Sequence, residues 1–291
     1  MRYHIWTEGC QMNEADSEKL AAGLAKLGWE PASRADDADL AVVNTCVIRQ
    51  KAEDRAVGYM SRLRMLKAER GDMQIAVMGC MVGPRTDDLR HRFPFVDVWA
   101  RPQNFEVIIR QLMPESDLGG EFWPETFPEP KGPTAFVPVV HGCNKFCTYC
   151  IVPYRRGREK SRSVEDIVRE VRLLSSRGVR EVTLLGQTVE AYGKDLPLIV
   201  GDGRKPDLAD LFDALSEIDS LARIRFLTSY PRDMTDRIIR SVGESPKVCE
   251  HFNIPVQAGD DEILARMRRG YTVEEYLECV TRIRRFVPGA S

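Results

Sequence analysis

The sequence predicts an α/β protein built in two parts, each around a parallel sheet. Short apolar strands alternate with amphipathic helices along the chain. A proline-rich stretch at 114–134 interrupts this alternation, and 291 residues exceed the size of one average domain. We therefore expect an N-terminal domain at 1–113, a linker at 114–134 and a second domain at 135–291.

The first part contains four expected strand–helix pairs. Strands are predicted at 3–8, 40–45, 74–78 and 96–99, and helices at 13–27, 51–68, 85–92 and 105–112. The first helix carries Leu20, Leu24 and Leu27 on one face and meets Gly28 as its stop signal. Such a series folds as a small flavodoxin-like, doubly wound sheet.

The second part repeats the pattern. Strands are predicted at 135–140, 181–185, 223–228 and 251–255, followed by helices at 164–177, 208–218, 235–242 and 273–286. This repetition is typical of a barrel of parallel strands. Four strands leave an open edge, so we expect the barrel to be incomplete and the chain to be truncated at its C-terminus.

Composition sets the broad class of protein. The chain is 43% hydrophobic and 30% charged with a net charge of -2, so no global basic field indicates a nucleic-acid partner, although a local basic patch would suffice. No apolar run is long enough to span a bilayer, and the N-terminus lacks the features of a signal peptide. These features predict a cytosolic protein with no membrane partner.

Cys143, Cys147 and Cys150 directly follow the first expected barrel strand, and barrel active sites lie at the carboxyl ends of strands. Three thiolates on one short loop can hold three irons of a 4Fe-4S cluster and leave the fourth iron open. Tyr149 offers a flat face that could pack on an adenine. A zinc site completed by His141 is the alternative.

Cys10, Cys46 and Cys80 are far apart in sequence, yet each follows an expected strand of the first sheet. The carboxyl ends of parallel strands meet at one edge, so the three thiols should converge there and could hold a second cluster. Ordinary buried cysteines are the alternative.

The spacing of Cys143, Cys147 and Cys150 resembles the radical SAM (S-adenosylmethionine) superfamily. Longer stretches resemble its methylthiotransferase family, most closely the MiaB type. They are TEGCQMN at 7–13, NTC at 44–46 with Arg49, MGC at 78–80, GCNKFCTYCIVPY at 142–154, RGRE at 156–159, LGQ at 185–187 and PVQ at 255–257. Thr188 and Ala258 depart from the family, which usually has Asn and Ser there.

The resemblance implies an α/β radical SAM barrel, two 4Fe-4S clusters and S-adenosylmethionine. In such enzymes the barrel cysteines, here Cys143, Cys147 and Cys150, hold the cluster that binds and cleaves SAM. The N-terminal cysteines, here Cys10, Cys46 and Cys80, hold an auxiliary cluster whose open iron carries the sulfur to be inserted. One SAM methylates that sulfur, and a second provides a 5′-deoxyadenosyl radical. The expected SAM contacts are Tyr149, Gly186 through an exposed backbone, Gln187 and Gln257. No catalytic residue is expected beyond the cluster ligands.

The implied activity is insertion of a methylthio group at C2 of N6-isopentenyladenosine, next to the anticodon of tRNA. Family members that act on threonylcarbamoyladenosine in tRNA or on a ribosomal protein aspartate remain alternatives. A non-catalytic iron–sulfur electron-transfer protein is an alternative of another class. The expected partners are an electron donor and tRNA, held by a C-terminal domain missing from this chain and by Arg155, Arg156 and Arg158.

Overall fold

The computed structural model describes residues 1–112, 129–199 and 201–291. They belong to two compact units, the first Met1–Pro128 with Tyr154–Arg156, and the second Glu129–Pro153 with Gly157–Ser291. Most of the predicted linker at 114–134 lies outside the described residues. Tyr154–Arg156 fall within the predicted second domain but group with the first unit.

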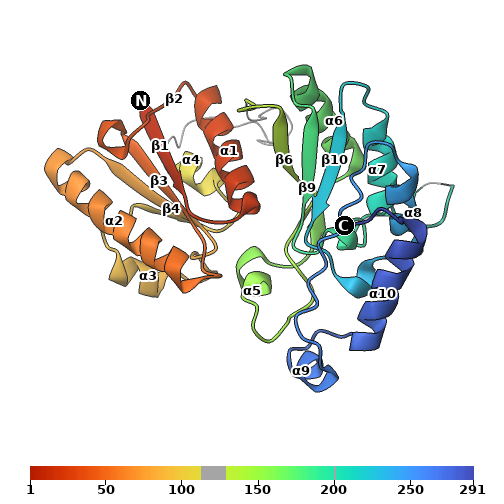
Figure 1. Ribbon diagram of the computed structural model, residues 1–291. Coiled ribbons are helices and arrows are strands. Elements are labelled where there is room, and N and C mark those ends of the chain that lie inside the picture. Colours follow the sequence, from red (N-terminus) through yellow and green to blue (C-terminus); the bar gives the residue numbers. More distant parts are fainter. Residues whose placement is uncertain (113–128, 200) are drawn as a thin grey trace. The chain divides into compact units, whose positions relative to one another are not determined.

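The first unit contains a parallel sheet with the strand order β2-β1-β3-β4-β5 (Figure 1). The strands are β1 (Arg2–Thr7), β2 (Glu30–Pro31), β3 (Leu40–Thr45), β4 (Gln74–Gly79) and β5 (Val98–Ala100). This order is the flavodoxin-like one, so the predicted fold class is confirmed. The sequence did not predict β2, because two residues carry no periodicity.

Helices cover both faces of this sheet. They are α1 (Gln11–Lys26), α2 (Gln50–Arg70), α3 (Asp87–Arg92) and α4 (Glu106–Leu112), with a 3-10 turn η1 at Ala35–Asp37. Leu20 of α1 shares one core with Ile108 of α4, whereas Met60 of α2 lies in a separate core. Strand β3 is buried along its whole length, as expected for a central parallel strand.

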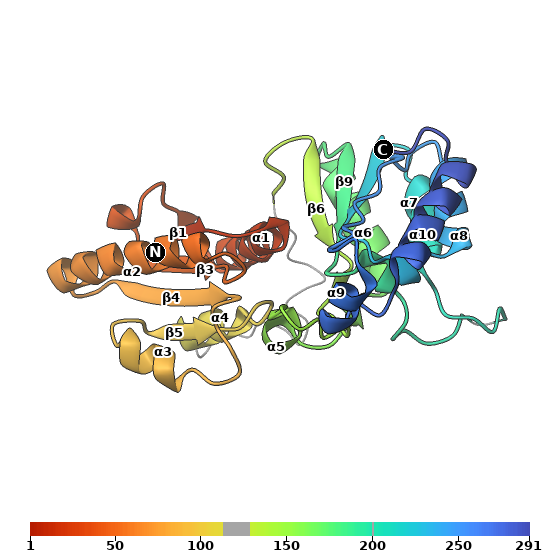
Figure 2. The ribbon, with the colours of Figure 1, turned by 60° about the horizontal axis from the view of Figure 1, so that its bottom comes forward.

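The second unit contains the parallel strands β6 (Thr134–Pro138), β9 (Glu181–Leu185) and β10 (Arg223–Leu227) in the order β10-β9-β6, and a small antiparallel pair, β7 (Val140–His141) with β8 (Lys160–Ser161). Four helices pack on one face of the three-stranded sheet (Figures 1 and 2). They are α6 (Val164–Ser176), α7 (Leu208–Ser216), α8 (Asp236–Glu244) and α10 (Val273–Phe286). This one-sided cover of a parallel sheet confirms the predicted partial barrel.

Shorter elements join these strands and helices. They are α5 (Val152–Arg156), α9 (Asp261–Arg266), and the 3-10 turns η2 (Val189–Ala191) and η3 (Pro231–Asp233). None of the described helices is long and apolar enough to cross a membrane.

The predicted strand at 251–255 is wrong. One parallel bridge joins Ile224 to Val248, and the Ser229 N–H donates to the Asn253 carbonyl, so this segment runs beside β10. However, the His251 N–H donates locally to the Cys249 carbonyl at 2.8 Å. This local bond turns the backbone and breaks the regular ladder that a strand requires.

Candidate metal centres

In the first unit, Cys10, Cys46 and Cys80 each lie just beyond a strand. They follow β1, β3 and β4, which are adjacent and parallel, so all three lie at the carboxyl edge of the sheet. Cys46 and Cys80 are buried and Cys10 is exposed, and all three are free thiols. The topology thus gathers three cysteines that are 34 or more residues apart in sequence.

A buried amide network joins the three cysteine-bearing loops. Asn13 donates through Nδ2 to the Asn44 Oδ1 at 2.7 Å and to the Thr45 carbonyl at 3.0 Å, while Asn44 returns a bond to the Asn13 carbonyl. The Cys10 thiol donates to the Asn13 Oδ1, and the Cys80 N–H donates to the Thr45 carbonyl. Because buried polar groups are costly when unpaired, this network fixes the loops relative to one another.

Two glycines make room for this network. A Cβ on Gly9 would lie 2.6 Å from the Asn13 Cγ, and a Cβ on Gly79 would lie 2.4 Å from the Asn44 Oδ1. Gly79 also has a φ of +95°, which residues with a side chain rarely adopt. The glycines before Cys10 and Cys80 therefore leave space for Asn13 and Asn44, whose hydrogen bonds hold the cysteine loops in place.

Arg156 belongs to the same unit and lies beside this cysteine group. Its side chain is 1% exposed and pairs at 3.1 Å with Asp16, whose side chain is 2% exposed. Burial raises the pKa of Cys80, whereas Arg156 lowers it through its charge and a hydrogen bond, and the charges of Cys10 and Cys46 raise it. The expectation that Arg156 contacts tRNA phosphate is wrong, because its guanidinium is buried and already paired.

In the second unit, Cys143, Cys147 and Cys150 lie on the loop that follows β7. Cys143 and Cys147 are buried and Cys150 is half-buried. The Lys145 N–H donates to the Cys143 Sγ at 3.5 Å, and the Cys150 N–H donates to the Cys147 carbonyl. Burial raises the pKa of both Cys143 and Cys150, and each also feels the charge of Cys147. The three sulfurs therefore share one electrostatic neighbourhood.

Two backbone anchors hold this loop. Asn144 binds the Glu159 carboxylate with its N–H and its Nδ2, each at 3.0 Å. Gly142 has a φ of +74°, and a Cβ there would lie 2.1 Å from the Arg158 carbonyl oxygen. The glycine before Cys143 is therefore required by a close backbone approach.

The four expected SAM contacts differ in their surroundings. Tyr149 is 52% exposed and Gln257 is exposed, while Gln187 is half-buried. Gln257 has a φ of +69°, and the bond from the Ala258 N–H to the Val256 carbonyl closes a tight turn around it.

The prediction that Gly186 exposes its backbone is wrong. Gly186 is buried against Val140 and Val189. A Cβ there would lie 2.6 Å from the Val140 Cγ1 and 3.0 Å from the Val189 Cα, so a larger residue would clash. Its small size serves packing at the end of β9.

Three functional candidates were not found from the sequence. Arg269 donates through Nη1 to the Cys147 Sγ at 3.4 Å. Lys145, inside the cysteine loop, pairs at 2.5 Å with Asp233. Burial raises the pKa of Glu190 to about 7, although its carboxylate accepts a bond from the Tyr230 N–H. Lys145 lies within the quoted motif at 142–154, but the contacts of all three residues are distant along the chain, so no local pattern predicts them.

The basic run at 155–162 divides between different environments. Arg158 is exposed and its guanidinium lies 4.5 Å from the centre of the Phe146 ring. Arg155 is half-buried, and its carbonyl accepts a bond from Arg101 within the first unit. Arg158 is thus the more available of these two for a phosphate contact.

The cysteine groups suit an iron–sulfur cluster better than a single ion. Across the part of the chain that the structure describes, no three His, Cys, Asp or Glu side chains lie close enough to hold one metal ion, and this applies to both cysteine groups as well as to a zinc site at His141. A zinc ion draws every sulfur to within about 2.3 Å of one point, whereas a 4Fe-4S cluster spreads its ligands over the corners of a cube. Both groups offer free thiols, and each has a buried arginine near one sulfur: Arg156 acts on Cys80, and Arg269 donates to Cys147.

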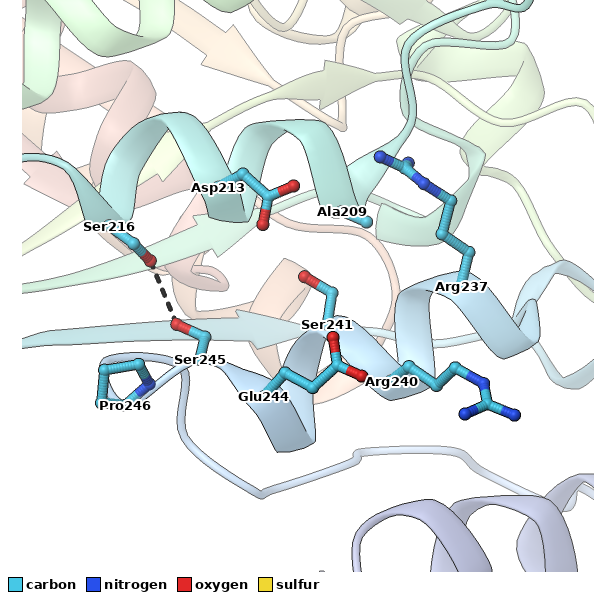
Figure 3. Close-up of a pocket in the computed structure, with 9 residues that line it drawn as sticks. All are labelled: Ala209, Asp213, Ser216, Arg237, Arg240, Ser241, Glu244, Ser245 and Pro246. Atoms are coloured by element: carbon cyan, nitrogen blue, oxygen red, sulfur yellow. Dashed lines mark hydrogen bonds between the residues drawn. The ribbon is translucent and has the colours of Figure 1, made fainter.

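A cavity of about 610 Å³ lies between α7 and α8 (Figure 3). Its lining mixes Asp213 and Glu244 with Arg237 and Arg240, and it includes none of the six cysteines. This cavity is therefore separate from both candidate metal centres.

Comparison with known proteins identifies two families along the chain. Residues 137–290 match the Radical SAM superfamily, and residues 2–101 match a family described as Uncharacterized protein family UPF0004.

Curated relatives match almost the whole chain. A tRNA-2-methylthio-N(6)-dimethylallyladenosine synthase of Dictyoglomus thermophilum is 44% identical, over 100% of this chain and 67% of the relative. Proteins with the same name from Dehalococcoides mccartyi and Moorella thermoacetica are 47% and 43% identical, over 99% of this chain and 65% and 67% of their own lengths. The chain thus spans about two thirds of the length of these relatives.

Solved structures share the fold at low identity. The cobalamin-dependent S-adenosylmethionine radical enzyme OxsB has a TM-score of 0.64 at 12% identity, over 97% of this chain and 47% of its own. The radical S-adenosylmethionine methyltransferase TsrM from Kitasatospora setae has a TM-score of 0.64 at 13% identity, over 98% of this chain and 66% of its own.

Proposed function

The chain belongs to the radical SAM methylthiotransferase family, and on this premise we propose that the whole protein attaches a methylthio group to C2 of N6-isopentenyladenosine in tRNA, next to the anticodon. The relatives named as tRNA-2-methylthio-N(6)-dimethylallyladenosine synthases support this substrate. The observation that carries the proposal is the second cysteine group, at the sheet edge of the first unit. A radical SAM enzyme with a single cluster does not require a second group of three cysteines.

Membership of the radical SAM superfamily implies SAM and a 4Fe-4S cluster. Cys143, Cys147 and Cys150 are the proposed ligands of that cluster, which when bound supplies the electron that cleaves SAM. Burial raises the pKa of the Cys143 and Cys150 thiols and so disfavours their thiolate forms in the absence of metal. Iron binding therefore releases protons from this loop and is favoured by higher pH.

Cys10, Cys46 and Cys80 are the proposed ligands of a second 4Fe-4S cluster. Support comes from the Ile48 N–H, which donates to the Cys46 Sγ at 3.5 Å, and from Arg156 beside Cys80. Arg156 stabilises the thiolate of Cys80 over the thiol. The amide network of Asn13, Asn44 and Thr45 keeps the three loops in register before iron arrives.

Tyr149, Gln187 and Gln257 are the proposed SAM contacts. Tyr149 adjoins Cys150 and leaves much of its ring exposed, so a nucleobase can stack on it. Strained backbone is another support, because Phe146, Thr228, Gln257 and Arg268 all have positive φ within the second unit. Such conformations concentrate at ligand sites.

The proposed partners are tRNA and an electron donor. Arg158 is the proposed phosphate contact on this chain, and further contacts come from the part of the relatives that this chain does not span. A single exposed arginine adds little affinity, so tRNA binding by residues 1–291 alone should be weak.

The test is product analysis with the whole protein, reconstituted with iron and sulfide and supplied with SAM and a reductant. Nucleosides from isopentenylated tRNA should gain a methylthio group, and Cys143→Ala should form neither this product nor 5′-deoxyadenosine. A methylthio group found only on threonylcarbamoyladenosine or on a ribosomal protein aspartate would overturn the substrate. 5′-Deoxyadenosine formed by Cys143→Ala would overturn the cluster assignment.

A further inference from the structure

Arg269 is a buried cation without a carboxylate. Only 7% of the residue is exposed. Among residues 1–112, 129–199 and 201–291, no Asp or Glu pairs with it, and the groups that act on its charge are Tyr271, Tyr149 and Cys147. A buried charge is stable only when other groups compensate for its lost hydration, so its position needs a reason.

The hydrogen bonds of Arg269 point to the cysteine loop. Nη1 donates to the Cys147 Sγ at 3.4 Å and to the Tyr149 hydroxyl at 3.2 Å. Nε donates to the Tyr271 hydroxyl at 3.2 Å, which itself donates to the Val256 carbonyl at 2.9 Å. The guanidinium therefore links one expected cluster ligand to Tyr149 and, through Tyr271, to the turn at Gln257.

Aromatic rings hold the guanidinium in this orientation. Its central carbon lies 5.0 Å from the centre of the Tyr230 ring and 5.3 Å from that of Tyr271. The two rings meet edge to face, with centroids 5.4 Å apart. Arginine stacks well on such rings, so few rotamers remain open to it.

The segment that carries Arg269 also holds the cysteine loop through its backbone. The Thr148 N–H donates to the Met267 carbonyl at 3.1 Å, and the Thr148 hydroxyl donates to the Arg266 carbonyl at 3.2 Å. Arg268 has a φ of +55° and Gly270 one of +69°, which together aim Arg269 inward. Segment 266–271 thus contacts the loop at three points, although it lies more than a hundred residues further along the chain.

We propose that Arg269 is a positioning residue of the radical SAM centre, which donates an N–H···S bond to the Cys147 thiolate and sets the reduction potential at that site. The proposal rests on the ligand assignment made under the proposed function. The proposal assigns a role to a residue outside the cysteine motif, namely donation of a charged N–H···S bond, which the cysteine ligands cannot provide. The same guanidinium fixes the ring of Tyr149, the proposed stacking partner of SAM.

The sign of the effect follows from charge. A cation and an N–H donor beside a thiolate ligand stabilise the more negative, reduced state, so they raise the reduction potential. Removing both the charge and the N–H donor must therefore lower the reduction potential. A guanidinium does not lose its proton in proteins, so the charge of Arg269 is permanent.

The experiment is an EPR-monitored redox titration of the whole protein carrying Cys10→Ala, Cys46→Ala and Cys80→Ala, so that only the Cys143 site contributes. Arg269→Met should lower the equilibrium constant for one-electron reduction at least tenfold, which corresponds to about 59 mV. Arg269→Lys keeps the charge and should shift the potential less. Arg284→Met, the matched control, removes an exposed arginine of α10 and should leave the potential unchanged.

Equal midpoints for Arg269→Met and Arg284→Met would overturn the inference. If Arg269→Met does not assemble iron, Arg269→Gln, which keeps a donor and loses the charge, carries the same expectation. No iron–sulfur signal from the parent protein would overturn the proposed function and this inference together. A normal parent signal with an unshifted potential in the Arg269 variants would overturn this inference alone.

Discussion

Gly79→Ala should destabilise the first unit and disturb Cys80, the residue that follows it. The added Cβ would lie 2.4 Å from the Asn44 Oδ1 and 2.5 Å from the Thr45 carbonyl oxygen, at a φ of +95°. A strained φ costs about 1–3 kcal/mol. Overpacking against buried backbone costs about 1–3 kcal/mol more. The expected loss of unfolding free energy is therefore about 2–6 kcal/mol.

Urea unfolding followed by tryptophan fluorescence measures this loss. All four tryptophans, Trp6, Trp29, Trp99 and Trp123, fall within residues 1–128 of the sequence, and residues 129–291 contain no tryptophan. With a urea m value of about 1–3 kcal/mol/M, a loss near 3 kcal/mol lowers the midpoint by about 1 M or more.

Gly58→Ala is the matched control for this substitution. Gly58 lies within α2, and a Cβ there meets nothing within 4 Å. Alanine should stabilise this helix by about 0.5–1 kcal/mol. The two substitutions thus add the same methyl group with opposite expected signs, and equal midpoints for both variants would refute the reasoning.

Three other predictions concern the two units separately. Asn44→Ala should cost the first unit about 1–3 kcal/mol, because it leaves buried partners of the amide unpaired; an unchanged fluorescence midpoint would show that the network is dispensable. Glu190→Gln tests pH dependence: the pKa is raised from 4.5 to about 7, so neutral Glu190 contributes stability below pH 4.5 that is lost as the pH rises through about 7. Hydrogen exchange of β9 should show the variant more stable than the parent by up to about 3 kcal/mol at pH 8 and similar near pH 5, and parallel pH profiles would contradict this. Gly186→Ala should cost about 1–3 kcal/mol through its contact with Val140, and Val140→Ala should relieve part of that cost in the double variant. Additive effects on β9 exchange would exclude the contact as the cause.

The longer strands of the first unit could be predicted because short runs of apolar residues in the sequence indicate buried strands. Leu40–Thr45 is an almost continuous apolar run, and the structure buries every residue of it. The convergence of Cys10, Cys46 and Cys80 then followed from topology alone, since parallel strands share one carboxyl edge. The two-residue strand β2 gave no such signal.

The remaining features depend on contacts that no local pattern records. Arg156 belongs to a basic run typical of a solvated loop, yet its burial depends on Asp16, 140 positions earlier. Arg269 is one of several arginines at 266–269, and only the fold shows which of them turns toward Cys147. Gly186 resembled a ligand contact in sequence, but the small residue serves packing against Val140.

The most direct test of the account is the iron and acid-labile sulfide content of the whole protein after anaerobic reconstitution. The parent should hold about eight irons per chain, as two 4Fe-4S clusters require. Replacing Cys143, Cys147 and Cys150 by alanine should leave about four, and so should replacing Cys10, Cys46 and Cys80. The account would be contradicted if the parent held about four irons and lost all of them when Cys143, Cys147 and Cys150 were replaced. That result would exclude the second cluster and, with it, the proposed methylthiotransferase chemistry.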